Sequence, residues 1–352
     1  MITPANADRP ARRPRRGASG EPSRCAAILL ALLALLAVVT GCARGGSSVT
    51  PAAPELAGGP LPTTRVIVYA DMTTSPPPDL AGYAQQTGQR DVAAAFVLAG
   101  VHGCDDPSWG GTVPVSDPRT AERIRALRDG GGTVTVVTGG AVAPYLETTC
   151  PDADSLTRAY ERTLDTVAVN SLDVDLEAAV DPDRVAEALA RLQQQRHTAV
   201  TLTLPVAGRD SALTAAGMDL LRALATRAVA VRTNIMAMNF PDPGPWAEAM
   251  TGAVDSATRQ LAQIWPTADP AELHRRLGVT LMIGRNDMGM ITTADDAETI
   301  VDHAREQGLG SVGMWSLARD SGTCPDAAAA RPDCSGVTQD VDAFTTVLQG
   351  FA

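Results

Sequence analysis

The residues best suited to chemistry stand together in one stretch, Asp173-Val174-Asp175-Leu176-Glu177. In a β-strand the period of two places the three acids on one face. Like charges on one face repel, so at least one carboxyl group is expected to hold a proton or accept strong hydrogen bonds. Glu177, the last of the three, is then placed to protonate a leaving group. A solvated acidic edge strand or a cation site is the alternative, but the flanking aliphatics disfavour solvation and the spacing is not that of a calcium loop.

The composition limits what other chemistry the chain can perform. Its 352 residues carry a formal charge of -11 and are 45% hydrophobic, which indicates a folded body and disfavours nucleic-acid binding. The chain contains no Lys, which removes Schiff-base and phosphate-binding lysines. The four His residues show no metal-ligand spacing and the cysteines form no CxxC pair. We therefore expect no metal and no organic cofactor.

Short apolar runs alternate with longer amphipathic segments after Arg65. Strands are expected over residues 65–71, 92–98, 133–138, 171–176, 199–204, 232–238, 279–283 and 311–316. Helices are expected over residues 155–169, 183–195, 211–226, 246–264 and 294–307, among others. This alternation predicts an α/β fold, a single-domain (β/α)8 TIM barrel. An open doubly wound sheet would normally carry a glycine-rich turn after its first strand, where Asp71-Met72-Thr73-Thr74 stands instead.

In such a barrel the active site lies at the carboxyl ends of the strands. These ends carry polar or aromatic residues where core packing would favour aliphatics. Besides the three acids they are Asp71, Gly139, Gly140, Met236 to Asn239, Asn286, Asp287 and Trp315. The candidate site is therefore spread over several strands and gathered only by the fold.

Asp173-x-Asp175-x-Glu177 at the end of the fourth strand resembles the signature of glycoside hydrolase family 18, the chitinases and their relatives. The resemblance covers about residues 66–320 and has four companions. They are Thr138-Gly139-Gly140 on the third strand, residues 234–240 on the sixth, Gly313-Met314-Trp315-Ser316 on the eighth, and the loop from Cys104 to Gly111 with Trp109. The Trp of the eighth strand forms the floor of the sugar site in that family.

The resemblance implies retaining, substrate-assisted hydrolysis of β-1,4-linked N-acetylglucosamine polymers or oligomers, without a cofactor. By it, Glu177 protonates the glycosidic oxygen and the substrate's 2-acetamido oxygen attacks the anomeric carbon. Asp175 orients the acetamido group, and Asp173 holds or exchanges a proton with Asp175. The expected substrate contacts are Asp71, Trp109, Gly139, Gly140, Met236, Met238, Asn239 and Trp315.

Two residues depart from the pattern of closer relatives, which read Met-x-Met-Asp-Tyr on the sixth strand. Here Asn239 and Phe240 replace the last two. Loss of a hydroxyl that contacts the acetamido group would slow turnover about 10- to 1000-fold. A non-catalytic or weakly catalytic oligosaccharide-binding barrel is therefore an alternative, although lectin-like members usually lose the acid that stands here as Glu177. An endo-β-N-acetylglucosaminidase acting on N-glycans is another, and the sequence does not separate it from a chitinase. The aromatic content of 3% favours a short, open site for soluble oligosaccharides.

The first 41 residues are expected to be a lipoprotein-type signal peptide. Several Arg residues precede an apolar run over residues 26–39, which is shorter than the roughly 20 residues that span a membrane. The run ends in Val39-Thr40-Gly41-Cys42, which resembles a bacterial lipobox and implies lipidation of Cys42. An ordinary secretory signal is the alternative. Residues 42–64 are then a flexible tether, residues 65–352 the barrel, and the protein an exported monomer at the cell surface or secreted.

Four cysteines remain after export, in an oxidising compartment. They are Cys104, Cys150, Cys324 and Cys334, for which three pairings exist. Proximity favours Cys104 with Cys150 and Cys324 with Cys334. Loop-closure entropy makes these bonds worth roughly 4 and 3 kcal/mol, respectively.

Overall fold

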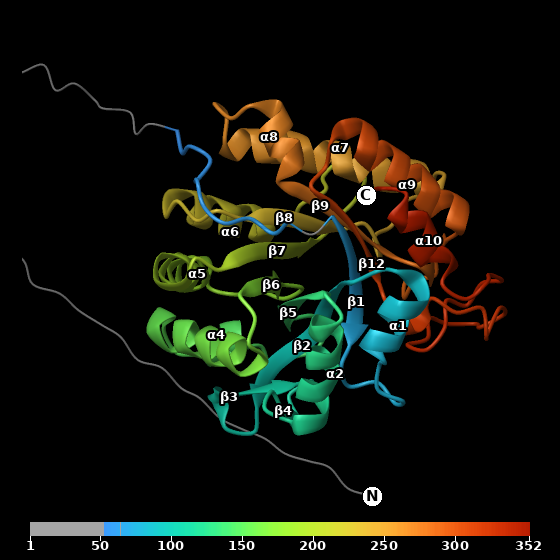
Figure 1. Cartoon of the computed structure of the whole chain (residues 1–352). Helices are drawn as coiled ribbons and strands as arrows, with labels where there is room; N and C mark the ends of the chain where they lie inside the picture. Colours follow the sequence, from blue (N-terminus) through green and yellow to red (C-terminus); the bar gives the residue numbers. More distant parts are fainter. Residues whose placement is uncertain (1–52, 64) are drawn as a thin grey trace, which may run out of the picture. The chain divides into compact units, whose positions relative to one another are not determined.

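A computed structural model describes residues 53–63 and 65–352, where eight parallel strands close into a barrel (Figure 1). The strands are β1 Val66–Asp71, β2 Asp91–Gly100, β5 Thr133–Gly139, β6 Ser171–Asp175, β7 Ala199–Pro205, β8 Arg232–Met236, β9 Leu277–Met282 and β12 Ser311–Trp315. Each pairs with the next in this order, and β12 pairs with β1. The predicted (β/α)8 barrel is confirmed, and each of the eight expected strands is present within two residues of its predicted bounds.

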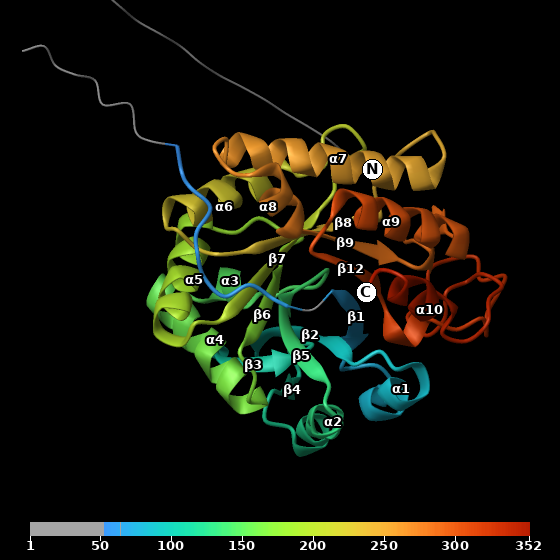
Figure 2. The ribbon, with the colours of Figure 1, turned by 45° about the horizontal axis from the view of Figure 1, so that its top comes forward.

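Helices surround the strands (Figure 2). They are α1 Leu80–Thr87, α2 Pro118–Asp129, α3 Leu146–Thr149, α4 Ala153–Val167, α5 Pro182–Arg196, α6 Ala215–Thr226, α7 Trp246–Ile264, α8 Pro270–Arg275, α9 Ala294–Gln307, α10 Ala343–Gln349 and a 3₁₀ turn, η1 Leu317–Arg319. The helix α9 begins where Thr293 and Asp296 cap each other's backbone N–H groups, a capping box that the sequence encodes locally. Helices α7 and α9 have the predicted bounds.

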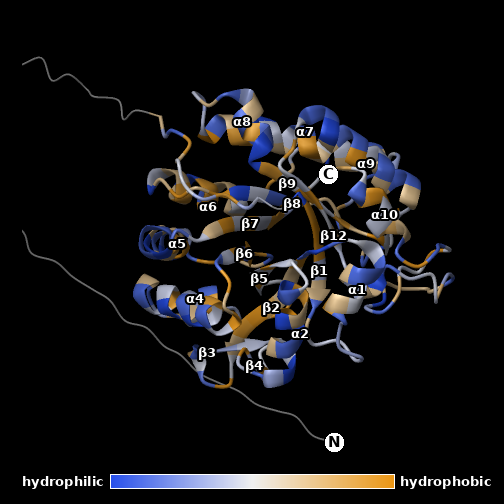
Figure 3. Cartoon of the chain, in the orientation of Figure 1, coloured by the Kyte–Doolittle hydropathy of each residue, from blue (hydrophilic) through white to orange (hydrophobic). Residues whose placement is uncertain are grey.

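The hydrophobic core lies mainly between the strands and the helices. Apolar colour follows the strands in Figure 3, while the helices alternate between apolar and polar residues. A smaller apolar cluster includes Ile67, Tyr69, Ala93, Ala95 and Val137. Within the described ranges, no helix is long and apolar enough to cross a membrane.

The register of β6 with its neighbours positions the acids. Asp175 is opposite Gly139 of β5 and Thr203 of β7. Gly139 has a φ of +85°, and a Cβ atom added there would lie 1.7 Å from the carbonyl oxygen of Asp175. Glycine is therefore required beside the second acid because the strand backbones approach so closely.

Two short hairpins add to the predicted elements. In one, β3 Gly103–Trp109 pairs antiparallel with β2 and with β4 Val113–Pro114. In the other, β10 Gly284–Arg285 pairs with β11 Ile291–Thr292. Both favoured disulfide pairings are confirmed, Cys104–Cys150 joining β3 to the end of α3 and Cys324–Cys334 closing a loop before α10. The expected signal peptide and Cys42 lie outside the described residues.

Candidate active site

A cavity of about 230 Å³ opens at the carboxyl ends of the strands. Its lining residues come from strands that are distant in sequence. They are Tyr69, Phe96, Ala141, Asp175, Glu177, Thr203, Pro205, Val206, Met236, Met238, Asn239, Thr280, Met282, Asp287 and Trp315. The fold thus brings together seven of the candidate residues from the strand ends, which are Asp175, Glu177, Met236, Met238, Asn239, Asp287 and Trp315.

Asp173 is buried inside the barrel. The Tyr69 hydroxyl donates to one of its carboxylate oxygens at 2.6 Å, and the Thr203 hydroxyl donates to the other at 2.7 Å. Burial raises the pKa of Asp173 to about 6, although both hydrogen bonds favour the charged form. This carboxyl group can therefore hold or release a proton near neutral pH.

Asp175 lies two residues after Asp173 on the same face of β6, where it lines the cavity. It is buried, and its Oδ1 atom has no hydrogen-bond partner among the described residues. Burial raises the pKa of Asp175 well above its usual value, and the charges of Glu177, Asp173 and Glu147 raise it further. A buried carboxyl oxygen is costly to leave unpartnered, and this one can accept a hydrogen bond from a ligand N–H group.

Glu177 follows β6 and reaches the rim of the cavity, so part of its side chain is exposed. The surrounding protein desolvates its carboxyl group and raises the pKa of Glu177, and the negative charge of Asp287 raises it further. A protonated acid at the rim can donate to a leaving group. Among the described residues, no group of His, Cys, Asp and Glu side chains is arranged to hold a metal ion.

Aromatic side chains form one side of the cavity. The ring centroids of Trp315 and Phe96 are 5.3 Å apart with an interplanar angle of 26°, and Tyr69 lies 6.4 Å from Trp315. The pairing of β2 with β5 is irregular between Ala94 and Val97, so strand alternation did not identify Phe96. Tyr69 was also missed, although it stands two residues before Asp71 and shares its face of β1.

The segment after β8 holds the two unusual residues. Asn239 lines the cavity and donates from Nδ2 to Asp287 Oδ2 at 2.9 Å. Phe240 is 1% exposed, does not line the cavity, and packs with its ring centroid 4.7 Å from that of Trp246. The expectation of a missing hydroxyl beside the sugar is therefore corrected, because Phe240 points into apolar packing.

Two other predicted substrate contacts require correction. Trp109 is fully buried in the core and cannot touch a ligand in the cavity. Asp71 does not line the cavity, since its carboxylate accepts hydrogen bonds from the N–H and hydroxyl groups of Thr73 at 2.8 and 2.6 Å. Trp109 is the last residue of β3, which pairs antiparallel with β2, and Asp71 is the last residue of β1, beside the turn at Thr73. Alternation along a strand encodes neither set of contacts.

The two glycines at the end of β5 act through the backbone. Gly140 donates its N–H to the carbonyl oxygen of Asp175 at 2.9 Å. A Cβ atom at Gly140 would lie 2.8 Å from the ring of Phe96. Gly139 and Gly140 therefore shape the cavity wall, and neither is among the lining residues.

A (β/α)8 barrel hosts many enzyme classes, and here the acid-bearing fourth strand and the aromatic cavity wall fit a glycoside hydrolase. The structure is similar to the catalytic domain of a hyperthermophilic chitinase from Pyrococcus furiosus, with 32% sequence identity and a TM-score of 0.77 over 84% of this chain and 97% of that chain. The chain belongs to glycoside hydrolase family 18 and is a glycoside hydrolase. No family model matches the sequence.

Two curated proteins are also similar in sequence. The chain is 27% identical over 294 residues to a probable bifunctional chitinase/lysozyme of Escherichia coli, covering 77% of this chain and 32% of that protein. It is 27% identical over 274 residues to Endochitinase 11 of Metarhizium anisopliae, covering 72% of this chain and 52% of that protein. The chain thus spans about a third and about half of the lengths of these relatives.

Proposed function

We propose that the protein is an exported chitinase that hydrolyses β-1,4 bonds between N-acetylglucosamine units with net retention. The observation that carries the proposal is the placement of Glu177 at the cavity rim with Asp175 buried behind it, one carboxyl oxygen unpartnered. Similar structures of the Pyrococcus furiosus enzyme, with 32% identity and a TM-score of 0.77, are described as complexed with chito-oligosaccharides.

In the proposed reaction, Glu177 donates its proton to the glycosidic oxygen as the bond to the anomeric carbon breaks. The substrate's acetamido carbonyl oxygen attacks that carbon and forms an oxazolinium ion. Asp175 accepts a hydrogen bond from the acetamido N–H and stabilises the positive charge that develops there. Water then opens the ring from the face that the leaving group occupied, with Glu177 as the base, and the configuration is retained.

Asp173 and Trp315 support this step in different ways. With the Tyr69 and Thr203 hydroxyls donating to it, Asp173 remains a proton reservoir beneath Asp175 as the charge on Asp175 changes. The ring of Trp315 offers an apolar surface for the face of a sugar. The volume of about 230 Å³ suits one sugar unit at this position better than a long chain.

The charge of the cavity favours an uncharged substrate. Its lining contains Asp175, Glu177 and Asp287, and none of the described lining residues is Arg or His. A muropeptide carries a lactyl carboxylate that would meet these acids without a cation to balance it. An endo-β-N-acetylglucosaminidase substrate would present the same uncharged N-acetylglucosamine unit, so it remains the second candidate.

Product analysis on chitotetraose, an N-glycopeptide and a muropeptide, assayed side by side, tests the proposal. We expect cleavage of chitotetraose, with the β anomer appearing first in proton NMR spectra. Cleavage of the N-glycopeptide alone would establish the endoglycosidase alternative. Binding of chitotetraose without any cleavage would establish the oligosaccharide-binding alternative, and initial α product would exclude the role given to Asp175.

We also propose export, a lipid anchor at Cys42 and a monomeric state. The support for export and the anchor is the sequence Val39-Thr40-Gly41-Cys42 after an apolar run over residues 26–39. Metabolic labelling with a fatty acid should mark the parent and not a Cys42→Ala variant. Equal labelling of both would refute the anchor, and light scattering of residues 53–352 checks the monomer.

A further inference from the structure

Asp287 lines the cavity as a third acid beside Asp175 and Glu177. It comes from a segment far from β6 in the sequence, and the proposed reaction does not use it. It lies between β10 and β11 and lines the cavity together with Glu177. The turn that presents it is anchored on both sides. Asn286, which is buried, donates to the carbonyl oxygens of Met282 and Gly284 before the turn at 2.9 and 3.1 Å, and to the hydroxyl of Thr292 after it at 3.2 Å. The position of Asp287 is therefore determined by the fold.

Asn239 holds this acid with its neutral amide. Its Nδ2 atom donates to Asp287 Oδ2 at 2.9 Å, and its Oδ1 atom accepts from the N–H group of Met288 at 3.3 Å. Asn239 has a φ of +54°, a conformation that asparagine adopts more readily than most residues. An aspartate at this position would lose the donor and place a second negative charge beside Asp287.

We propose that Asp287, held by Asn239, is a positioning residue that keeps the proton on Glu177. The inference rests on the proposed function, in which Glu177 is the general acid. Desolvation already favours the protonated form of Glu177, and a nearby negative charge strengthens its hold on the proton that it must donate. The negative charge of Asp287 across the same cavity opposes the loss of that proton.

The other groups facing these two acids are consistent with this role. Glu177 is also faced by Asp175 from β6 and by the Tyr145 hydroxyl from the segment after β5, and both lack positive charge. The negative charge of Asp287 favours the charged form of Arg319 in η1, although burial lowers the pKa of Arg319 to about 10. Arg319 itself donates to the carbonyl oxygens of Ile283 and Arg285.

The test is the pH profile of kcat on chitotetraose for Asp287→Asn, which removes the charge and keeps the shape. The alkaline limb should move to lower pH, so that activity on the alkaline side of the parent's limb falls severalfold. Activity below the limb should change little. The matched control is Asp210→Asn, which removes an exposed carboxylate of the segment after β7 and should leave the limb in place. An unmoved limb in folded Asp287→Asn would overturn the inference.

The swap Asn239→Asp with Asp287→Asn checks that the effect is electrostatic. The swap restores one negative charge, and a hydrogen bond from the new amide at position 287 to the new carboxylate at position 239 replaces the one that Asn239 donates. The alkaline limb should therefore return toward the parent value. Asn239→Asp alone should not behave like the swap, because it sets two acids side by side. A swap whose limb stays with that of Asp287→Asn would contradict the assignment to charge.

Carbon-13 NMR titration of the Glu177 carboxyl gives a readout without turnover. Its signal is identified by its absence in Glu177→Gln, and it should titrate at a lower pH in Asp287→Asn than in the parent. If the parent does not cleave chitotetraose, the proposed function fails while this titration still decides the inference. An identical titration in both proteins would refute the role of Asp287.

Discussion

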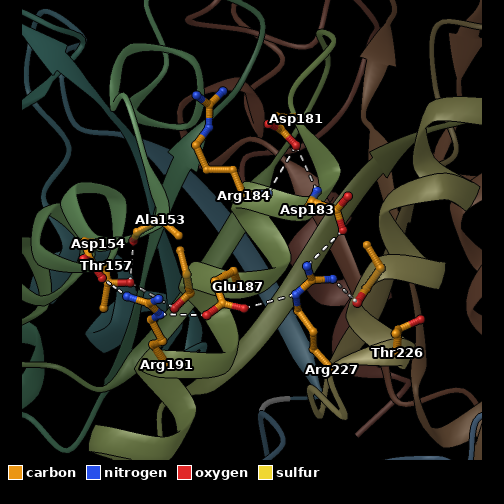
Figure 4. Close-up of polar contacts among 12 residues, drawn as sticks. Ala153, Asp154, Thr157, Asp181, Asp183, Arg184, Glu187, Arg191, Thr226 and Arg227 are labelled. Carbon is orange, nitrogen blue, oxygen red and sulfur yellow. Dashed lines mark hydrogen bonds and ion pairs between the residues drawn. The ribbon is translucent and has the colours of Figure 1, made fainter.

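Carboxyl groups occupy two contrasting regions of this molecule. On the helical shell, Arg191 of α5 pairs with Asp154 of α4 and with Glu187 (Figure 4). Arg227, which follows α6, pairs with Asp183 and Glu187 at 3.0 and 3.3 Å. These acids have a cation within reach and water around them, and their ion pairs join neighbouring helices.

The acids of the cavity lack both a nearby cation and full contact with water. Asp173 and Asp175 are buried and Glu177 is partly desolvated, and the lining that the structure describes contains no Arg or His. The pKa of each is raised, with burial as the largest cause. The same residue types therefore serve as charged surface partners outside the barrel and as proton carriers inside it, and the environment makes the difference.

The largest expected effect is on Glu177. Glu177→Gln keeps the shape and removes the proton that leaves with the glycosidic oxygen, so kcat should fall by about 10²- to 10⁴-fold or more. Oligosaccharide affinity should remain largely intact because the ground-state contacts are kept. Calorimetric titration and initial rates measure both, with Glu187→Gln on the shell as the matched control. Equal turnover in Glu177→Gln and the parent would exclude the assignment.

A second prediction concerns the pH dependence of stability at Asp173. Its pKa is raised from 3.8 to about 6 in the folded protein, so the folded state binds this proton more tightly than the unfolded state. The resulting stabilisation is complete below about pH 4 and is lost as the pH rises toward 6. Relative to Asp173→Asn, the parent should therefore lose about 2 kcal/mol of unfolding free energy between pH 4 and pH 7. Denaturant melts at both pH values check it, and a constant difference would contradict it.

A smaller loss of stability is expected for Phe240→Tyr, which sets a buried uncharged side chain beside the buried acids. Phe240 is 1% exposed against Trp246, so the new hydroxyl would be buried among apolar atoms. An unsatisfied hydroxyl there costs about 1–3 kcal/mol. We expect a lower melting temperature and no gain in rate on chitotetraose. A faster and equally stable variant would show instead that position 240 reaches the substrate.

The smallest effect is expected on the shell. Arg191→Ala removes two ion pairs whose side chains are all more than a third exposed. Exposed pairs of this kind contribute about 0–1 kcal/mol each and are screened by salt. Denaturant melts at low and high salt should show a small loss that shrinks as salt is added. A large, salt-independent loss would mean that the stem of Arg191 matters through packing.

Much of the architecture could be predicted because its signals are local. Apolar runs of strand length, amphipathic segments of helix length and caps such as Thr293 with Asp296 depend on residues near one another in sequence. The alternation of acids and aliphatics from Asp173 to Glu177 likewise fixed which side chains share a face of β6. Residue spacing also favoured the two disulfide pairings that the structure contains.

The sequence by itself thus determined the barrel, the strand that carries the three acids, and the family resemblance. Only the tertiary structure decided which residues at and beyond the strand ends face the cavity. It buried Trp109 and Phe240, turned Asp71 toward Thr73, and brought Asn239 and Asp287 to 2.9 Å across 48 positions of chain. Strand periodicity ends where a strand ends, and contacts between loops that are distant in sequence depend on how all eight strands close.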